Sequence, residues 1–136
     1  MPFYLICLVY SGIELNIFLT GFLLIGLGEI LRFFSVGYLG FSSRKTEYAG
    51  ADELVISGPF RFVRNPIYLG NMSIYLGFAV LSNVFFPVFP AITIAFFMFV
   101  YYFIIRYEES VLLAKFDQNY EEYLLSVPRF FPLLLP

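Results

Sequence analysis

Histidine and tryptophan are missing from this chain of 136 residues, and Cys7 is its single cysteine. With one cysteine the chain cannot form an internal disulfide. Without histidine it lacks the commonest metal ligand and the side chain that titrates near neutral pH, so we expect no metal site and no histidine-based catalysis. Charged residues make up only 13% of the sequence. They form no basic cluster outside the apolar segments, so we expect no nucleic-acid partner.

Hydrophobic residues are what the chain has in abundance. They account for 60% of it, and the mean hydropathy is +0.83, values that a soluble domain does not reach. Apolar stretches long enough to cross a hydrocarbon core of about 30 Å occur more than once. The composition therefore predicts a single all-α domain over residues 1–136, a polytopic bundle of transmembrane helices surrounded by membrane lipid.

Three apolar segments predict three main transmembrane helices, at about residues 11–38, 66–84 and 90–108. The first is long enough to cross with a tilt, and an apolar lead-in precedes it at residues 3–10. Residues 83–90 contain two prolines and no charge, which predicts a tight hairpin between the second and third helices.

Small residues in the first two predicted helices would permit close packing of a neighbouring helix. They are Gly21, Gly26 and Gly28 in the first helix and Gly70, Ser73 and Gly77 in the second. In a membrane, small side chains allow two helix backbones to come close. We therefore expect close helix contact here, with room for a bound ligand as the less common alternative.

Two polar segments, the loop 42–64 and the tail 109–136, carry most of the charge. All eight basic residues lie near the exit of the first helix, in this loop, or from the end of the third helix onward. The positive-inside rule then places the loop and the tail in the cytoplasm and the N-terminus outside. The size of the chain and its lack of targeting signals fit a bacterial-type inner membrane.

The sequence of the tail predicts two further helical segments. Residues 109–115 continue the third helix, and Asp117 can cap a further short one. This last helix places Tyr120, Tyr123, Leu124 and Val127 on one face. We expect it to lie at the cytoplasmic membrane interface.

The junction between the loop and the second helix combines turn-forming and helix-starting residues. Gly58 and Pro59 favour a turn, Pro66 suits the first turn of a helix, and Asn65 is a suitable N-cap residue. A helix start presents free N–H groups and a positive dipole, to which Arg64 adds a full charge. The sequence therefore predicts an anion-binding corner at the membrane surface.

The second and third helices should meet at their cytoplasmic ends, because each spans roughly 28 Å over about 19 residues. The polar residues brought together there are Arg64, Asn65, Arg106, Glu108 and Glu109. Such a corner offers a cation for a carboxylate and a carboxylate for an ammonium group, the two ends of an amino-acid zwitterion. On spacing alone, charges that only mark the helix ends at the headgroups are the commoner explanation. Glu108 and Glu109 differ by about 100° around a helix, so we expect one to face the site and favour Glu108.

Three segments together give the chain a family resemblance. They are residues 57–70 (Ser-Gly-Pro-Phe-Arg-Phe-Val-Arg-Asn-Pro-Ile-Tyr-Leu-Gly), the pair Glu108-Glu109, and residues 127–132 (Val-Pro-Arg-Phe-Phe-Pro). In this combination the chain from Gly26 onward resembles the isoprenylcysteine carboxyl methyltransferase and phospholipid methyltransferase families. The resemblance implies an integral-membrane enzyme that binds S-adenosylmethionine at the cytoplasmic ends of its helices without a Rossmann domain. In agreement, no Gly-x-Gly-x-x-Gly follows a predicted strand.

The resemblance also implies roles for single residues. Arg64 matches the motif arginine that handles the acceptor, and Arg64 and Glu108 are the implied catalytic residues. The implied cofactor-binding residues are Asn65, Pro66, Tyr68, Gly70, Glu108 and Glu109. Asn65 stands where the family most often has histidine. Asparagine donates and accepts hydrogen bonds but does not titrate.

The implied reaction is methyl transfer to a lipophilic acceptor that enters from the membrane. The acceptor stays open among an isoprenylcysteine-like carboxylate, a phospholipid amine and a small hydrophobic acid or thiol, and a homo-oligomer is left open as well. Two other interpretations compete. One is an NADPH-dependent membrane reductase of the sterol reductase type, which has a loosely similar Arg-His-x-x-Tyr region, and the other is a non-catalytic membrane scaffold.

Overall fold

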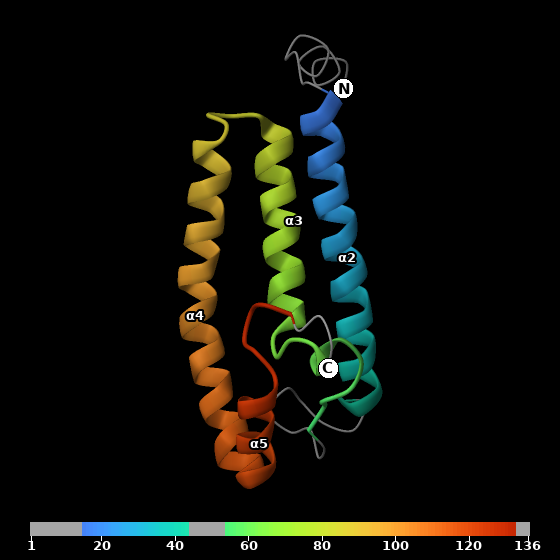
Figure 1. The fold of residues 1–136 in the computed structure, drawn as a ribbon, viewed down its shortest axis with the longest axis vertical. Helices are drawn as coiled ribbons and strands as arrows, with labels where there is room; N and C mark the ends of the chain where they lie inside the picture. The colour runs from blue at the N-terminus through green and yellow to red at the C-terminus, as the bar shows by residue number, and fades with distance from the viewer. Residues whose placement is uncertain (1–14, 44–53, 133–136) are drawn as a thin grey trace.

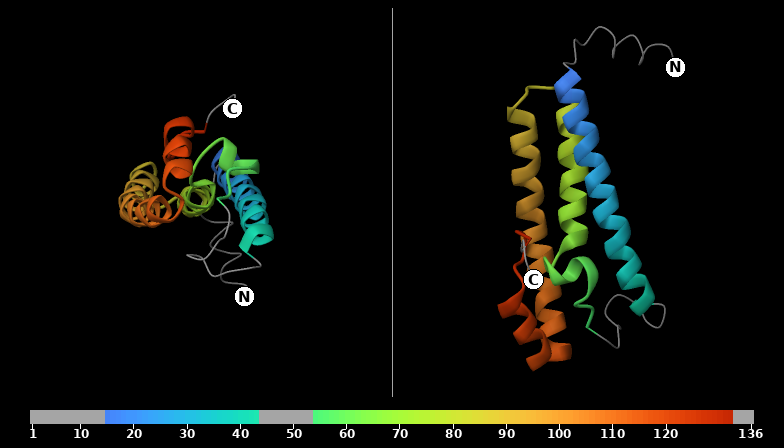
Figure 2. Two further views of the ribbon diagram at one scale, coloured as in Figure 1. Left: turned by 90° about the horizontal axis from the view of Figure 1, so that it is seen from below. Right: turned by 45° about the vertical axis from the view of Figure 1, so that its right-hand side comes forward.

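The computed structural model describes residues 15–43 and 54–132, and their regular structure is all helical. Its elements are α2 (Leu15–Ser43), the short 3-10 helix η1 (Gly58–Arg61), α3 (Pro66–Ser82), α4 (Val88–Phe116) and α5 (Gln118–Ser126). Figures 1 and 2 show α3 between α2 and α4, with α5 beside the lower end of α4. After α5 the chain turns back toward the start of α3 (Figure 1). The predicted lead-in at 3–10 and the start of the first helix lie outside the described residues.

Membrane crossing is supported for two of the three predicted transmembrane helices. In the described ranges, α2 and α4 are long and apolar enough to span a bilayer. Both expose large apolar side chains, such as Phe33 and Phe99, which favours lipid over water around them. The helix α3 is apolar but has 17 residues, about 25 Å at 1.5 Å per residue. Its crossing stays a prediction.

The helix boundaries differ from the predicted ones mainly at the helix ends that were predicted to be cytoplasmic. The helix α2 continues to Ser43 instead of ending near residue 38, because no proline stops it. The helix α4 begins at Val88 and runs unbroken to Phe116, as the predicted continuation of the third helix requires. After Pro90 it contains neither glycine nor proline, so nothing interrupts its hydrogen bonding.

The helices α2 and α3 are in close backbone contact through small residues, as predicted. A Cβ atom placed on Gly77 would lie 2.7 Å from the Gly21 carbonyl oxygen, and one on Gly28 would lie 2.7 Å from that of Gly70. The Ser73 hydroxyl donates a 2.7 Å hydrogen bond to a backbone carbonyl oxygen of α2. Gly26 takes no part, because nothing lies within 4 Å of a Cβ at that position.

The short helix α5 closes the lower end of the bundle. Tyr120, Tyr123 and Val127 are buried together, as the predicted face requires, and Leu124 lies at the edge of their cluster. Leu54, from the loop before η1, packs on the same cluster. The tail therefore folds onto the segment that leads into α3.

Replacing Gly77 by alanine should destabilise the protein by about 1–3 kcal/mol, because the new methyl group meets backbone atoms of α2 that cannot move aside cheaply. The matched control is Gly26→Ala, in the open, where alanine should be neutral or stabilising by up to about 1 kcal/mol. Unfolding in mixed micelles by titration with a denaturing detergent measures both. Equal effects of the two substitutions would contradict the close α2–α3 contact.

Candidate functional site

The start of α3 is confirmed at Pro66, and Asn65 occupies the N-cap position. The Asn65 side chain does not cap the helix as predicted. Instead its amide nitrogen donates a 3.2 Å hydrogen bond to the backbone carbonyl oxygen of Arg129. The reason is that the tail lies against this junction, and the backbone N–H of Arg64 likewise donates to the Pro128 carbonyl oxygen at 2.9 Å. The junction therefore holds the tail in place.

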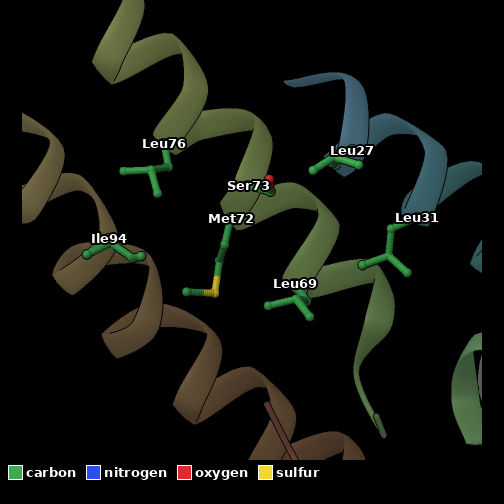
Figure 3. A pocket seen from close by; sticks show the side chains of 8 residues that line it. Leu27, Leu31, Leu69, Met72, Ser73, Leu76 and Ile94 are labelled. Atoms are coloured by element: carbon green, nitrogen blue, oxygen red, sulfur yellow. The ribbon is translucent and has the colours of Figure 1, made fainter. Parts of the chain in front are cut away.

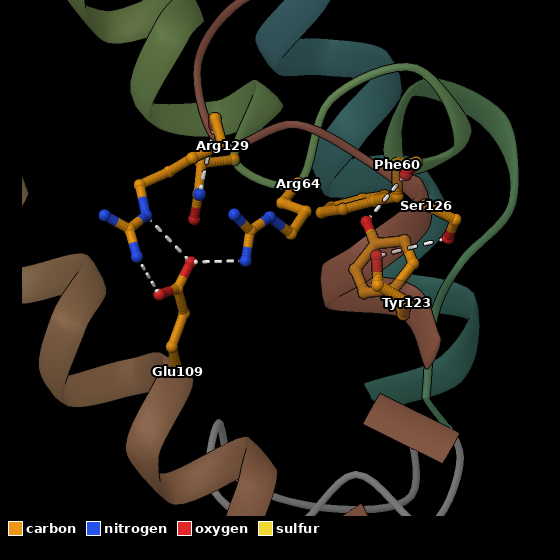
Figure 4. Close-up of polar contacts among 7 residues, drawn as sticks. Phe60, Arg64, Glu109, Tyr123, Ser126 and Arg129 are labelled. Carbon is orange, nitrogen blue, oxygen red and sulfur yellow. Dashed lines mark hydrogen bonds and ion pairs between the residues drawn. The ribbon is translucent and has the colours of Figure 1, made fainter. Parts of the chain in front are cut away.

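The Glu109 carboxylate connects the beginning of α3 with the end of α4 (Figure 4). Its Oε1 lies 3.0 Å from Arg64 Nη1, and both side chains are only 12% exposed. At such burial an ion pair is screened much less than at the surface. The predicted meeting of an Arg-bearing helix start with an acidic helix exit is thus confirmed, through Glu109.

Arg129 is a site residue that the sequence analysis missed. Its Nε donates to Glu109 Oε1 at 3.1 Å, and its Nη2 to Oε2 at 2.5 Å, in a two-pronged contact. Its guanidinium also lies over the Tyr102 ring, 5.8 Å from the ring centre. The hydrogen bond to Glu109 raises the pKa of Arg129. A signal for it was present in the sequence. Pro128 favours extended backbone at Val127, which ends the last helix just before the charged Arg129.

Glu108 lies beside Tyr68 of α3. The Tyr68 hydroxyl donates a 2.6 Å hydrogen bond to Glu108 Oε1, and the Tyr68 ring packs on Tyr101, 4.7 Å between ring centres. No hydrogen bond or ion pair within the described residues involves the second oxygen of Glu108, whereas both oxygens of Glu109 are taken. This difference favours Glu108 as the carboxylate available to a ligand, which stays a prediction.

The other residues singled out from the sequence occupy different surroundings. Pro66 is buried in the junction itself. Gly70 faces α2, because a Cβ atom there would lie 2.8 Å from the Gly28 carbonyl oxygen. Arg106 is exposed and forms no ion pair with any described residue. Across residues 15–43 and 54–132, no group of three potential ligands is placed to hold a metal ion.

The Arg64–Glu109–Arg129 ion pairs and the Tyr68–Glu108 hydrogen bond together form a polar cluster. An apolar groove of about 300 Å³ runs along α3, further along the helix than Arg64 (Figure 3). It is lined by Leu27, Gly28 and Leu31 of α2, Leu69, Met72, Ser73 and Leu76 of α3, and Ile94 of α4. Met72 also belongs to the buried cluster with Tyr101 and Ile105, on which Tyr68 packs. Met72 therefore lines the groove and also belongs to the buried cluster on which Tyr68 of the polar cluster packs.

A family model of phospholipid methyltransferases matches residues 16–119 of the chain. The matched region contains α2, α3 and α4 and ends at the start of α5. No curated protein and no solved structure matches the chain. Of the residues around Glu109, Arg64 lies within the matched region and Arg129 beyond it.

Tyr123 connects α5 to η1, the short helix before the site, because its buried hydroxyl donates a 2.6 Å hydrogen bond to the Phe60 carbonyl oxygen (Figure 4). Tyr123→Phe should destabilise the protein by about 1–2 kcal/mol at pH 7, since that carbonyl loses its partner. The control is Tyr107→Phe at an exposed ring, which should change little. Detergent-induced unfolding measures both, and equal effects would contradict the role of the bond.

Alkaline pH should also weaken the tail. Burial raises the pKa of Tyr120 from 10.0 to about 12 and also raises that of Tyr123. Both phenols favour the native state below pH 10, and this contribution falls as pH rises from 10 toward 12, because the unfolded chain releases its protons first. Between pH 10 and 12, each phenol should lower the free energy of unfolding by roughly 1.4 kcal/mol per pH unit. Tyr120→Phe should remove one of these two contributions from the slope of the unfolding free energy against pH. An unchanged slope would contradict this.

Proposed function

The chain belongs to the phospholipid methyltransferase family, and from this membership we propose that it transfers a methyl group from S-adenosylmethionine to a lipophilic acceptor at the cytoplasmic face of a membrane. The observation that carries the proposal is the meeting of the α3 start with the α4 exit. There Arg64 is 3.0 Å from Glu109, and Tyr68 is 2.6 Å from Glu108. A basic and an acidic group thus lie side by side next to an apolar groove.

The residues present suit the amino-acid end of this methyl donor. Glu108 has an oxygen that forms no hydrogen bond or ion pair with the described residues and could accept from an ammonium group. The first N–H groups of α3 could hold the carboxylate of the donor. The Arg64 Nε is buried and has no hydrogen-bond partner in the described structure. A buried donor without a partner supports a ligand acceptor at this place.

The chemistry asks little of the protein. S-adenosylmethionine supplies, when bound, a methyl group that its sulfonium already activates. The residues of this chain then have to orient the acceptor in line and keep water away. The rings of Tyr68 and Tyr101, which are tilted against each other, supply aromatic groups that favour a cation. No side chain has to titrate near neutral pH for this role, which fits a chain without histidine.

The apolar groove supports a hydrocarbon chain on the acceptor. Its lining is almost wholly aliphatic, and it opens between α2 and α4 on the side of α3 (Figure 3). An acceptor carboxylate could be oriented by Arg64 and needs no base. An acceptor amine must give up a proton as its nitrogen takes the methyl group, and a glutamate or a water molecule must accept that proton.

The donor should bind to the purified protein in lipid nanodiscs, and S-adenosylhomocysteine, the product form, is the probe for calorimetry. Glu108→Gln should weaken its binding by about tenfold or more, the weight of one charge-assisted hydrogen bond, whereas Arg64→Ala, which removes a group assigned to the acceptor, should change it much less. Arg61→Ala removes an exposed arginine of η1 and serves as the control. Binding of NADPH instead would favour a reductase, and binding of neither would favour a scaffold.

Methyl transfer itself should be visible with labelled S-adenosylmethionine and a panel of lipid fractions. The panel contains isoprenylcysteine-like carboxylates, aminophospholipids, and hydrophobic acids and thiols. The mass of the labelled product names the acceptor class. A protein that binds S-adenosylhomocysteine but labels only water-soluble compounds would contradict the lipophilic acceptor.

The proposed orientation places the loop 42–64 and the tail in the cytoplasm and the N-terminus outside. Single cysteines on a Cys7→Ser background test it with a membrane-impermeant thiol reagent applied to intact cells. Asn83→Cys, in the turn between α3 and α4, should be labelled from outside. Lys115→Cys, near the end of α4, should be labelled only after the membrane is broken. The reverse pattern would overturn the orientation.

A further inference from the structure

Arg129 lies outside the region that the family model matches, yet it contacts Glu109 of the site. Two of its nitrogens reach the two oxygens of Glu109, at 3.1 and 2.5 Å. A fork of this kind fixes the plane of a carboxylate, which a single ion pair does not. The orientation of Glu109 is therefore set from the tail, by a residue 20 positions further along the chain.

Glu109 in turn sets the position of Arg64. Its Oε1 accepts from Arg129 and lies 3.0 Å from Arg64 Nη1, so one oxygen links the two guanidinium groups (Figure 4). Arg64 and Glu109 are each 12% exposed, and Arg129 is 27% exposed. Arg129 is thus the most exposed of the three, and the low exposure of Arg64 and Glu109 strengthens the attraction between their charges.

The backbone holds Arg129 in this place. Residues 127–130, the C-terminal strap, are held against the α3 start by the hydrogen bond from Arg64 N–H to Pro128 and by that from the Asn65 side chain to Arg129. The Tyr102 ring of α4 lies under the guanidinium. The strap therefore contacts both helices that build the site.

We propose that Arg129 is a positioning residue, whose fork on Glu109 keeps Arg64 aimed at the acceptor and leaves Glu108 to the methyl donor. The two glutamates then have separate tasks. Glu109 is satisfied within the protein, and Glu108 contacts the ligand. This inference rests on the proposed function and deepens it for the same site.

The test compares Arg129→Ala, Arg129→Lys, Glu109→Gln and the double variant with wild type in nanodiscs, with Arg61→Ala as the charge-matched control. S-adenosylhomocysteine affinity reports on the donor side. The KM for the lipid that is labelled in the panel described above reports on the acceptor side. Arg129→Ala should raise this KM by about tenfold or more and change donor affinity much less. Lysine should restore part of the loss, because it brings the charge without the fork.

Thermal unfolding of wild type, Arg129→Ala, Glu109→Gln and the double variant forms a cycle that needs no ligand. Since both groups act as one unit, adding Arg129→Ala to Glu109→Gln should cost little more. Additive shifts of the unfolding midpoint would overturn the inference. So would equal losses of donor affinity and acceptor KM in Arg129→Ala, or a lysine variant equal to wild type. A wild-type chain that binds no S-adenosylhomocysteine would overturn the proposed function instead, and the cycle would still report on the Arg129–Glu109 contact.

Discussion

A carboxylate buried between two guanidinium groups sets the geometry of the end of the bundle where α3 begins. Glu109 is 12% exposed and contacts Arg64 on one side and Arg129 on the other. Charges taken out of water are costly unless each finds its partners, and removing one member of such a group costs about 3–5 kcal/mol. The three residues come from the loop before α3, from α4 and from the tail. Their attraction therefore holds together segments that are 20 and 45 positions apart in the chain, and neighbouring contacts such as the bond from Asn65 to the strap follow from it.

The frame behind this cluster is the close contact of α2 with α3. Gly21 and Gly28 face Gly77 and Gly70 so tightly that a methyl group has no space between the backbones. Inside a membrane, helices gain little from excluding lipid, and close packing of small residues is what holds them together. This contact uses one face of α3 and leaves another to α4, from which Tyr101 and Ile105 pack with Met72. The polar cluster and the apolar groove therefore share the central helix.

The chain belongs to a family of methyltransferases that act on lipid-related substrates. Asparagine stands at position 65, and its side chain holds the tail instead of capping the helix. Of the two adjacent glutamates, Glu109 is saturated by arginines of the chain, whereas Glu108 has one hydrogen bond within residues 15–43 and 54–132, from Tyr68. Under the proposed function, Glu109 positions Arg64 and Glu108 binds the methyl donor. A site of this kind orients and shields its ligands, which suits a reaction whose methyl group arrives activated.

Much of the fold was determined by the sequence itself. Apolar runs specify helices in a membrane, Pro66 and the prolines of residues 83–90 fix where α3 and α4 begin, and the spacing of Tyr120, Tyr123 and Val127 predicts the buried face of α5. These signals are local, so they can be read along the chain. Which glycines touch, that Glu109 pairs with Arg64 while Glu108 accepts from Tyr68, and that Arg129 returns to the site were decided only by the tertiary structure. The physical reason is that these contacts depend on how each helix is rotated about its axis and on the path of the tail, and both are set by packing between segments distant in sequence.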